Sequence, residues 1–164
     1  MTPELPHPIR LDQVTRAGLR LTIEADAAQR AALAVRMGIP AIAALRCKFR
    51  LRREGESVVT AEGTLTARVT QTCVVSLEDF ETTVAETFRV RFVPSGEERE
   101  DVDPDDDDEI PYEDGVFDLG EAAAEQLGLA LDPYPRMPDA ALPEIEPNDE
   151  PHPFAALGAL RKPG

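Results

Sequence analysis

The stretch VVTAEGTLTARVTQTCVVSLEDFETTVAETFRVRFV, residues 58–93, decides the fold. In its first half, small and apolar side chains alternate with threonines and charged residues, and the apolar set is Val59, Ala61, Leu65, Ala67, Val69 and Cys73. In its second half the apolar set is Val84, Phe88, Val90 and Phe92. A period of two residues is typical of a strand with one buried face. The two halves therefore predict an antiparallel hairpin, with residues 74–80 as its connection.

Two further strands are predicted on the N-terminal side of this hairpin. Residues 17–25, AGLRLTIEA, alternate in the same way, and so do residues 45–53, LRCKFRLRR. The polar turn at residues 54–56 leads from the second of these strands into the hairpin. We therefore expect an antiparallel meander.

The strand at residues 45–53 carries a row of cations on one face. Its outward positions are Arg46, Lys48, Arg50 and Arg52. Neighbours in this row lie about 6.6 Å apart, because each strand residue advances about 3.3 Å. Such a row can follow a phosphate backbone or clamp an acidic protein segment. Alternatively, it protects a sheet edge against aggregation or is neutralised by the acidic half of the same chain.

Two helices are predicted to accompany the sheet. Asp26 is placed to cap a helix that continues to Met37, and its small-residue stripe is expected to lie on the sheet. The members of this stripe are Ala28, Ala31, Ala32 and Val35. Asp118 is placed to cap a second helix over residues 119–131, which we also expect on the sheet. The fold class is therefore α+β, an antiparallel β-meander sheet packed against two or three helices.

The charge is divided unevenly along the chain. Residues 1–94 hold 13 Lys and Arg against 11 Asp and Glu, whereas residues 95–164 hold 4 against 21. We expect a single domain over residues 1–136, with a long, flexible acidic loop at about 95–111. Residues 137–164 are predicted to form a Pro-rich tail that ends in a short apolar patch, PFAALGAL. An acidic half disfavours nonspecific nucleic-acid binding and favours basic protein partners.

The sequence lacks the patterns of the common enzyme and cofactor sites. It contains no G-x-G-x-x-G, Walker loop, H-E-x-x-H or G-x-S-x-G motif. His7 and His152 lie in Pro-rich segments, and Cys47 and Cys73 are expected to be buried, reduced thiols. We therefore expect a cytoplasmic protein that is not an enzyme and that has no cofactor, metal, membrane or DNA partner; a small-molecule ligand is not expected.

Several pieces of the chain, in order, resemble the YceD family, the large ribosomal RNA subunit accumulation proteins of bacteria and plastids. The matching pieces are ADAAQRAALA at 25–34, EGTLTARVTQTCVVSLEDF at 62–80, FRVRF at 88–92, DLGEAAAEQLGLALDPYPR at 118–136 and PFAALGAL at 153–160. The family-motif residues in these pieces are Cys73, Ser76, Leu77, Asp132, Pro133, Tyr134 and Pro135. Many members have C-x-x-C-L in the hairpin loop. Here Ser76 replaces the second thiol, which argues against a metal or redox role for this loop.

The resemblance implies a non-enzymatic role in the accumulation or processing of 23S ribosomal RNA during ribosome biogenesis. Two hypotheses about the binding surface remain open. In the first, outward cations hold pre-ribosomal RNA; the candidates are Arg46, Lys48, Arg50, Arg52, Arg68, Arg89 and Arg91. In the second, the acidic loop and the C-terminal patch hold a basic ribosomal protein, and the protein is an adaptor or chaperone without direct RNA contact.

Overall fold

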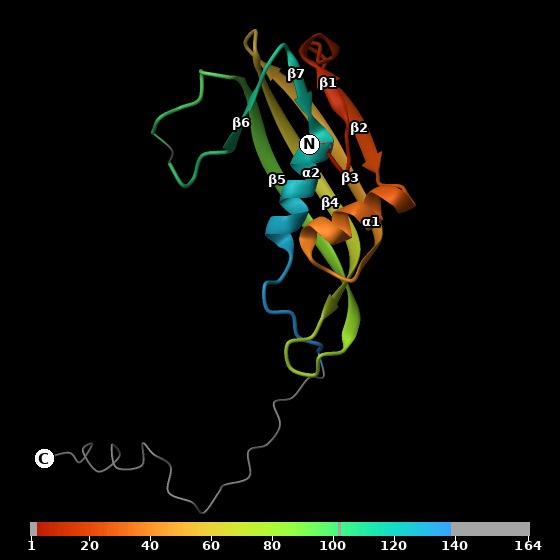
Figure 1. The fold of residues 1–164 in the computed structure, drawn as a ribbon. Helices are drawn as coiled ribbons and strands as arrows, with labels where there is room; N and C mark the ends of the chain where they lie inside the picture. The colour runs from red at the N-terminus through yellow and green to blue at the C-terminus, as the bar shows by residue number, and fades with distance from the viewer. Residues whose placement is uncertain (1–2, 102, 139–164) are drawn as a thin grey trace, which may run out of the picture.

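The computed structural model describes residues 3–101 and 103–138, and its largest feature is a five-stranded sheet (Figure 1). The strand order is β2-β3-β4-β5-β6. The bounds are β2 Leu19–Glu24, β3 Ala41–Glu54, β4 Val58–Thr72, β5 Asp79–Pro94 and β6 Asp108–Tyr112. The first four strands form the predicted antiparallel meander. β3 begins at Ala41, four residues before the predicted start of this strand.

The fifth strand makes the sheet mixed. β6 pairs with β5 in parallel, with Val90 opposite Asp108 and Pro94 opposite Tyr112. Residues 95–107 form the connection, which is long enough to return the chain for parallel pairing. The predicted acidic loop therefore ends earlier than its assigned limit, since residues 108–111 belong to β6. The predicted tail and its apolar patch fall on residues 137–164, of which only 137 and 138 are among the described residues.

Two helices and a small second sheet cover one face of the main sheet (Figure 1). α1, Ala27–Met37, contacts β3, and α2, Leu119–Ala130, contacts β4 and β5. The small sheet pairs β1, Pro8–Arg10, with β7, Val116–Asp118, and a short 3-10 helix, η1 Leu11–Gln13, follows β1. Both predicted caps are present. The Asp26 carboxylate accepts from the Gln29 amide at 2.8 Å, and that of Asp118 from the Glu121 amide at 3.2 Å.

The orientation predicted for α1 is wrong. Its stripe of small residues faces solvent, and Val35 is 83% exposed. The helix instead buries Leu33 and Ala34. A leucine removes far more apolar surface from water than alanines do, so the face that contains Leu33 packs on the sheet. Arg36 then lies near the edge of the buried face and bridges to Glu4 and Glu121, at 3.0 and 2.7 Å.

The core lies between the sheet and its cover. It is largely aliphatic, and Leu33, Leu51, Leu65, Leu119 and Leu127 are fully buried. Two aromatic contacts complete it: Phe92 stacks on Phe117 with ring centroids 4.5 Å apart, and Phe49 meets Phe88 edge to face at 5.8 Å. No helix in the described part of the chain combines the length and apolar character needed to cross a membrane.

Candidate functional site

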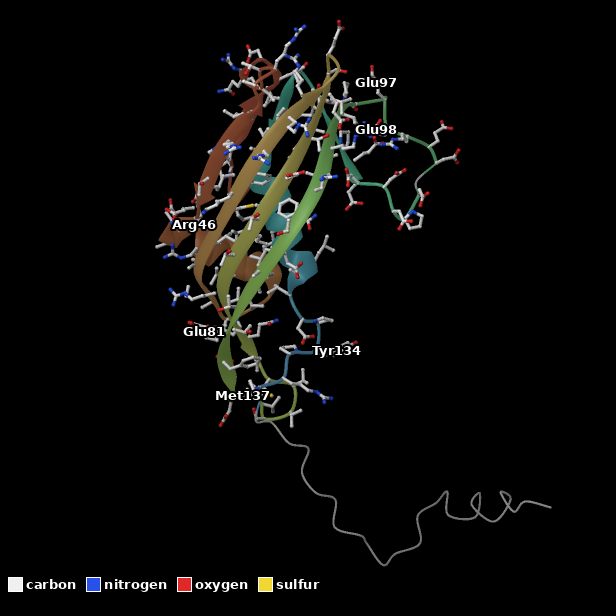
Figure 2. The ribbon with its side chains drawn as sticks, turned by 180° about the vertical axis from the view of Figure 1, so that it is seen from behind. Arg46, Glu81, Glu97, Glu98, Tyr134 and Met137 are labelled. Carbon is white, nitrogen blue, oxygen red and sulfur yellow. The ribbon has the colours of Figure 1, made fainter. Side chains whose placement is uncertain are left out.

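The opposite face of the five-stranded sheet carries no covering helix or strand from the described residues (Figure 2). Arg46, Lys48, Arg50 and Arg52 all point outward from this face and are exposed. β3 is the second strand of the sheet, with β2 at the edge. The hypothesis that the cation row protects a sheet edge is therefore wrong. We call this surface the open face.

Four of the seven candidate cations are paired with carboxylates of other strands in the sheet. The pairs are Arg46 with Glu24, Arg68 with Glu81, Arg89 with Glu62, and Arg91 with both Glu54 and Glu109. The Arg89 and Arg91 pairs are close, with nitrogen to oxygen distances of 2.7 Å to Glu62 and 2.8 Å to Glu109. Their charges are balanced within the protein, so these four contribute less to binding an external anion.

The other three candidates, Lys48, Arg50 and Arg52, make no ion pair with any residue that the structure describes. Arg20 of β2 is likewise unpaired and lies directly opposite Arg50 in the β2–β3 register. Like charges in directly opposed positions destabilise a sheet. We call Arg20, Lys48, Arg50 and Arg52 the unpaired cation cluster. The Arg20–Arg50 juxtaposition is unfavourable for folding, while on its β4 side Arg50 lies opposite Glu62, which pairs with Arg89.

Arg20 was not among the predicted site residues. The alternation of residues 17–25 already places Arg20 on the outward side of its strand. Its position beside Arg50 depends on the register between β2 and β3, and that register joins residues 30 positions apart. From the sequence alone, the alternation could therefore show that Arg20 faces outward, but it could not show that Arg20 lies beside Arg50.

Threonines flank two members of the cluster, Lys48 and Arg52, whereas Glu62 of β4 lies opposite Arg50. Lys48 lies between Thr22 of β2 and Thr64 of β4 in the register, and Arg52 lies beside Thr60. A shallow hollow of about 500 Å³ adjoins Lys48, and its lining includes Arg46, Lys48, Thr64, Thr66, Arg68 and Thr83. The open face therefore combines cations with hydroxyl groups that both donate and accept hydrogen bonds.

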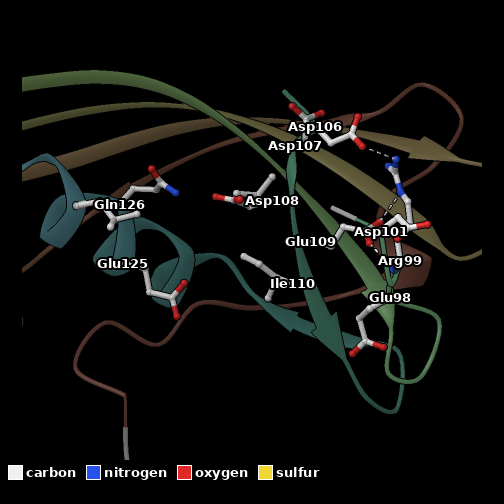
Figure 3. Close-up of a pocket in the computed structure, with 12 residues that line it drawn as sticks. Glu98, Arg99, Asp101, Asp106, Asp107, Asp108, Glu109, Ile110, Glu125 and Gln126 are labelled. Atoms are coloured by element: carbon white, nitrogen blue, oxygen red, sulfur yellow. Dashed lines mark hydrogen bonds and ion pairs between the residues drawn. The ribbon is translucent and has the colours of Figure 1, made fainter. Parts of the chain in front are cut away.

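Residues 95–107, which we call the acidic segment, form a second polar region at the other edge of the sheet (Figure 3). Arg99 anchors it: its amide donates to Glu109 at 2.8 Å, and its guanidinium pairs with Asp106 at 3.2 Å. The Arg99 amide and then the Arg99 guanidinium, together with Arg91, lower the pKa of Glu109. These contacts bind the end of the segment to the sheet.

A cleft of about 390 Å³ lies between this segment, β6 and α2. Its lining is mostly acidic and includes Glu98, Asp101, Asp107, Asp108 and Glu125. Burial, and then the neighbouring Glu121, raise the pKa of Glu125. Within the described ranges, no group of three or more His, Cys, Asp or Glu side chains is arranged to hold a metal ion.

The two family-motif segments, which lie about 60 residues apart in the sequence, meet at the far end of the hairpin (Figure 2). The Val74 amide donates to the Pro135 carbonyl at 2.9 Å, and the Gln71 side chain donates to the Asp132 carbonyl at 3.1 Å. Pro133 lies in the same exposed turn, and Leu77 and Tyr134 remain 77% and 74% exposed. Strand periodicity gave no signal for this contact, because both segments lie outside regular strands.

Cys73 is the centre of this contact. The amides of Ser76 and Met137 both donate to its sulfur at 3.4 Å. The Ser76 side chain, followed by these two amides, lowers the pKa of the Cys73 thiol to about 7. Burial alone raises the pKa of the Cys47 thiol to about 12. Both cysteines are buried and free, as the sequence predicted.

Taken together, the fold and the site define a small α+β protein with an open, cation-bearing sheet face. The family model described as "Large ribosomal RNA subunit accumulation protein YceD" matches residues 61–161, and the chain therefore belongs to the YceD family. This confirms the resemblance seen in the sequence and links the chain, at family level, to ribosome biogenesis. Neither the curated proteins nor the solved structures contain a match.

Proposed function

We propose that this protein is a non-enzymatic, cytoplasmic factor in the biogenesis of the large ribosomal subunit. In this proposal it binds the backbone of pre-ribosomal RNA through the open face. The unpaired cation cluster supplies the charge, and the surrounding threonines supply hydrogen bonds to phosphate and ribose. Family membership supports the association with large-subunit RNA.

One observation carries the proposal: Arg20, Lys48, Arg50 and Arg52 stand together on a sheet face that no other described element covers, and they make no ion pair with a described residue. Cations that serve stability are usually paired, as Arg46 and Arg91 are here. When cations neutralise RNA phosphates, counterions are released, and this release favours binding without any covalent step. The acidic segment lies at the β6 edge, away from β2 and β3, so its charge opposes this contact only weakly.

The test is affinity for large-subunit RNA fragments as a function of salt. If four cations contact four phosphates, the slope of log K against log salt is about −3 to −4. The variant Arg50→Glu/Arg52→Glu should reduce the magnitude of this slope by about 2 and weaken binding throughout. Arg10→Glu, a single charge reversal on the small sheet, is the control and is compared with Arg50→Glu alone as well as with the double variant. Equal binding by all of these proteins would contradict the proposal.

The acidic segment supports a second candidate function, an adaptor for a basic ribosomal protein. Most of its carboxylates, including Glu97, Glu98, Asp103 and Asp105, are exposed and make no ion pair among the described residues. Changing Asp101, Asp103, Asp105 and Asp107 to Asn removes charge but keeps the Arg99 contacts with Asp106 and Glu109. Loss of a basic ribosomal protein from pull-downs, combined with unmeasurable RNA binding by the unaltered protein, would favour this candidate over the first.

A further inference from the structure

We infer that the RNA bound by the open face is double-helical. This inference rests on the proposed function and specifies its ligand. It follows from what the open face presents, which is unpaired cations and hydroxyls beside arginines already paired with carboxylates, and from what it lacks, which is any aromatic side chain among the described residues.

The aromatic side chains of the described residues are directed elsewhere. Phe49, Phe80, Phe88 and Phe92 share the parity of the inner, covered face. The remaining three are Tyr112 and Phe117, which are buried, and Tyr134, which lies in the turn beyond α2. Single-stranded RNA is recognised mainly by stacking its bases on aromatic rings. The open face offers no such platform.

Double-helical RNA requires different contacts. Its bases are enclosed, and proteins recognise it through phosphates and 2′-hydroxyls across the wide, shallow minor groove. The outward threonines Thr22, Thr64, Thr66 and Thr87 are exposed, and Thr22 and Thr64 flank Lys48 in the register. Their hydroxyls can donate to and accept from a 2′-hydroxyl. These hydroxyls, together with the neighbouring Lys48, can contact the ribose and phosphate groups of a helical backbone.

The dimensions of the face also fit a duplex. Adjacent strands are about 4.8 Å apart, so β2 to β5 span roughly 14 Å. Lys48 to Arg52 extends about 13 Å along β3, at about 3.3 Å per residue. This surface is broad, and the hollow beside Lys48 is shallow, whereas a single strand is usually held in a groove that tracks its backbone.

The experiment compares three probes by fluorescence anisotropy with the full chain. They are a 20-base-pair RNA duplex (about the length that a duplex-binding domain spans), one unstructured strand of the same length, and a DNA duplex of the same sequence. We expect the RNA duplex to bind about tenfold or more tightly than the single strand. Tighter or equal binding of the single strand would overturn this inference but leave the proposed function intact. Absence of binding to every RNA would overturn both.

Two variants separate charge from hydroxyl contacts. Thr64→Val/Thr66→Val keeps the shape and strand preference of the side chains, and it should lower the preference for duplex RNA over duplex DNA severalfold. Arg50→Glu should weaken RNA and DNA binding alike. Thr15→Val, at an exposed position in the turn before β2, is the control. An unchanged RNA preference in the double variant would contradict the role assigned to the threonines.

Discussion

The two faces of the main sheet are built by the same strands, and they differ in almost every physical property. Along β3, Cys47, Phe49 and Leu51 are buried beneath the helices, while Lys48 and Arg50 stand in solvent. The inner face contributes stability because its apolar surface is removed from water. The open face contributes little stability and keeps uncompensated charge. This contrast indicates that the scaffold and the binding surface are separable by mutation.

The contrast is tested most strongly by neighbouring residues of one strand. Leu51→Ala should lower the free energy of unfolding by about 3 kcal/mol, because it leaves a cavity under a fully buried side chain. Arg50→Thr, one residue away on the open face, should change it by no more than about 0.5 kcal/mol. Urea denaturation measures both. Comparable losses in the two variants would mean that the faces are not separable.

A smaller loss is expected from adding a methyl group to the inner face. Gly63 lies beneath the Phe88 ring, and a Cβ at this position would lie 2.3 Å from the ring. Gly63→Ala should therefore destabilise the protein by about 1–3 kcal/mol through overpacking. Thr64→Ala, on the open face of the same strand, is the control for altered strand preference. Thermal unfolding of both variants gives the comparison, and a stable Gly63→Ala protein would refute tight packing here.

The ion pairs sharpen the contrast within the open face itself. The Arg91 and Glu109 side chains are only 18% and 14% exposed, whereas those of Arg89 and Glu62 are 53% and 39% exposed. Double-mutant cycles with alanine should give a coupling of about 1 kcal/mol for the first pair and about 0.5 kcal/mol or less for the second, because water screens exposed charges. A larger coupling for the exposed pair would contradict this ranking.

The two thiols extend the comparison to the pH dependence of folding stability, for which we expect the smallest changes. Because the folded pKa of Cys73 is lowered to about 7, its contribution to stability is present above the ordinary thiol value of 9.0 and is lost as pH falls through 7. The contribution of buried Cys47 has the opposite pH dependence. Its raised pKa stabilises the folded protein below pH 9, and this stabilisation is lost as the pH rises towards 12.

This effect is measured as the unfolding free energy of the unaltered protein relative to Cys73→Ala and Cys47→Ala between pH 7 and 10. The difference from Cys73→Ala should grow as pH rises from 7 to 9, and the difference from Cys47→Ala should shrink above pH 9. Ser76→Ala removes one donor to Cys73 and should reduce the first trend. Parallel trends for the two cysteines would contradict the assigned pKa directions.

Much of the fold was predictable because strand residues alternate. The alternation predicted that Val69 points to the buried face of the sheet and Arg68 to the opposite face. Asp26 and Asp118 marked the starts of the helices. The orientation of α1 was not predictable in this way. The helix has apolar side chains both on the small-residue stripe and on the side that contains Leu33, and packing against the sheet selected the latter. The parallel addition of β6 was missed because its strand begins within the acidic run, at Asp108.

The candidate site was predicted in part. The outward cations of β3 followed from alternation, but which of them are unpaired depended on the carboxylates that the neighbouring strands bring beside them. On the β2 side, Glu24 lies across from Arg46, whereas Arg20 lies across from Arg50; on the β4 side, Glu62 lies across from Arg50 but pairs with Arg89. A sequence pattern fixes the side of a strand on which a residue lies, and it does not fix the strand register.

By itself, the amino-acid sequence determined the four strands of the antiparallel meander, the helix caps, the family and the segregation of charge along the chain, because these depend on local periodicity and composition. Only the tertiary structure decided which sheet face is covered, which cations lack partners and how Cys73 meets the segment at Asp132 to Met137. These features depend on contacts between residues far apart in the chain, and such contacts are set by packing the whole core at once.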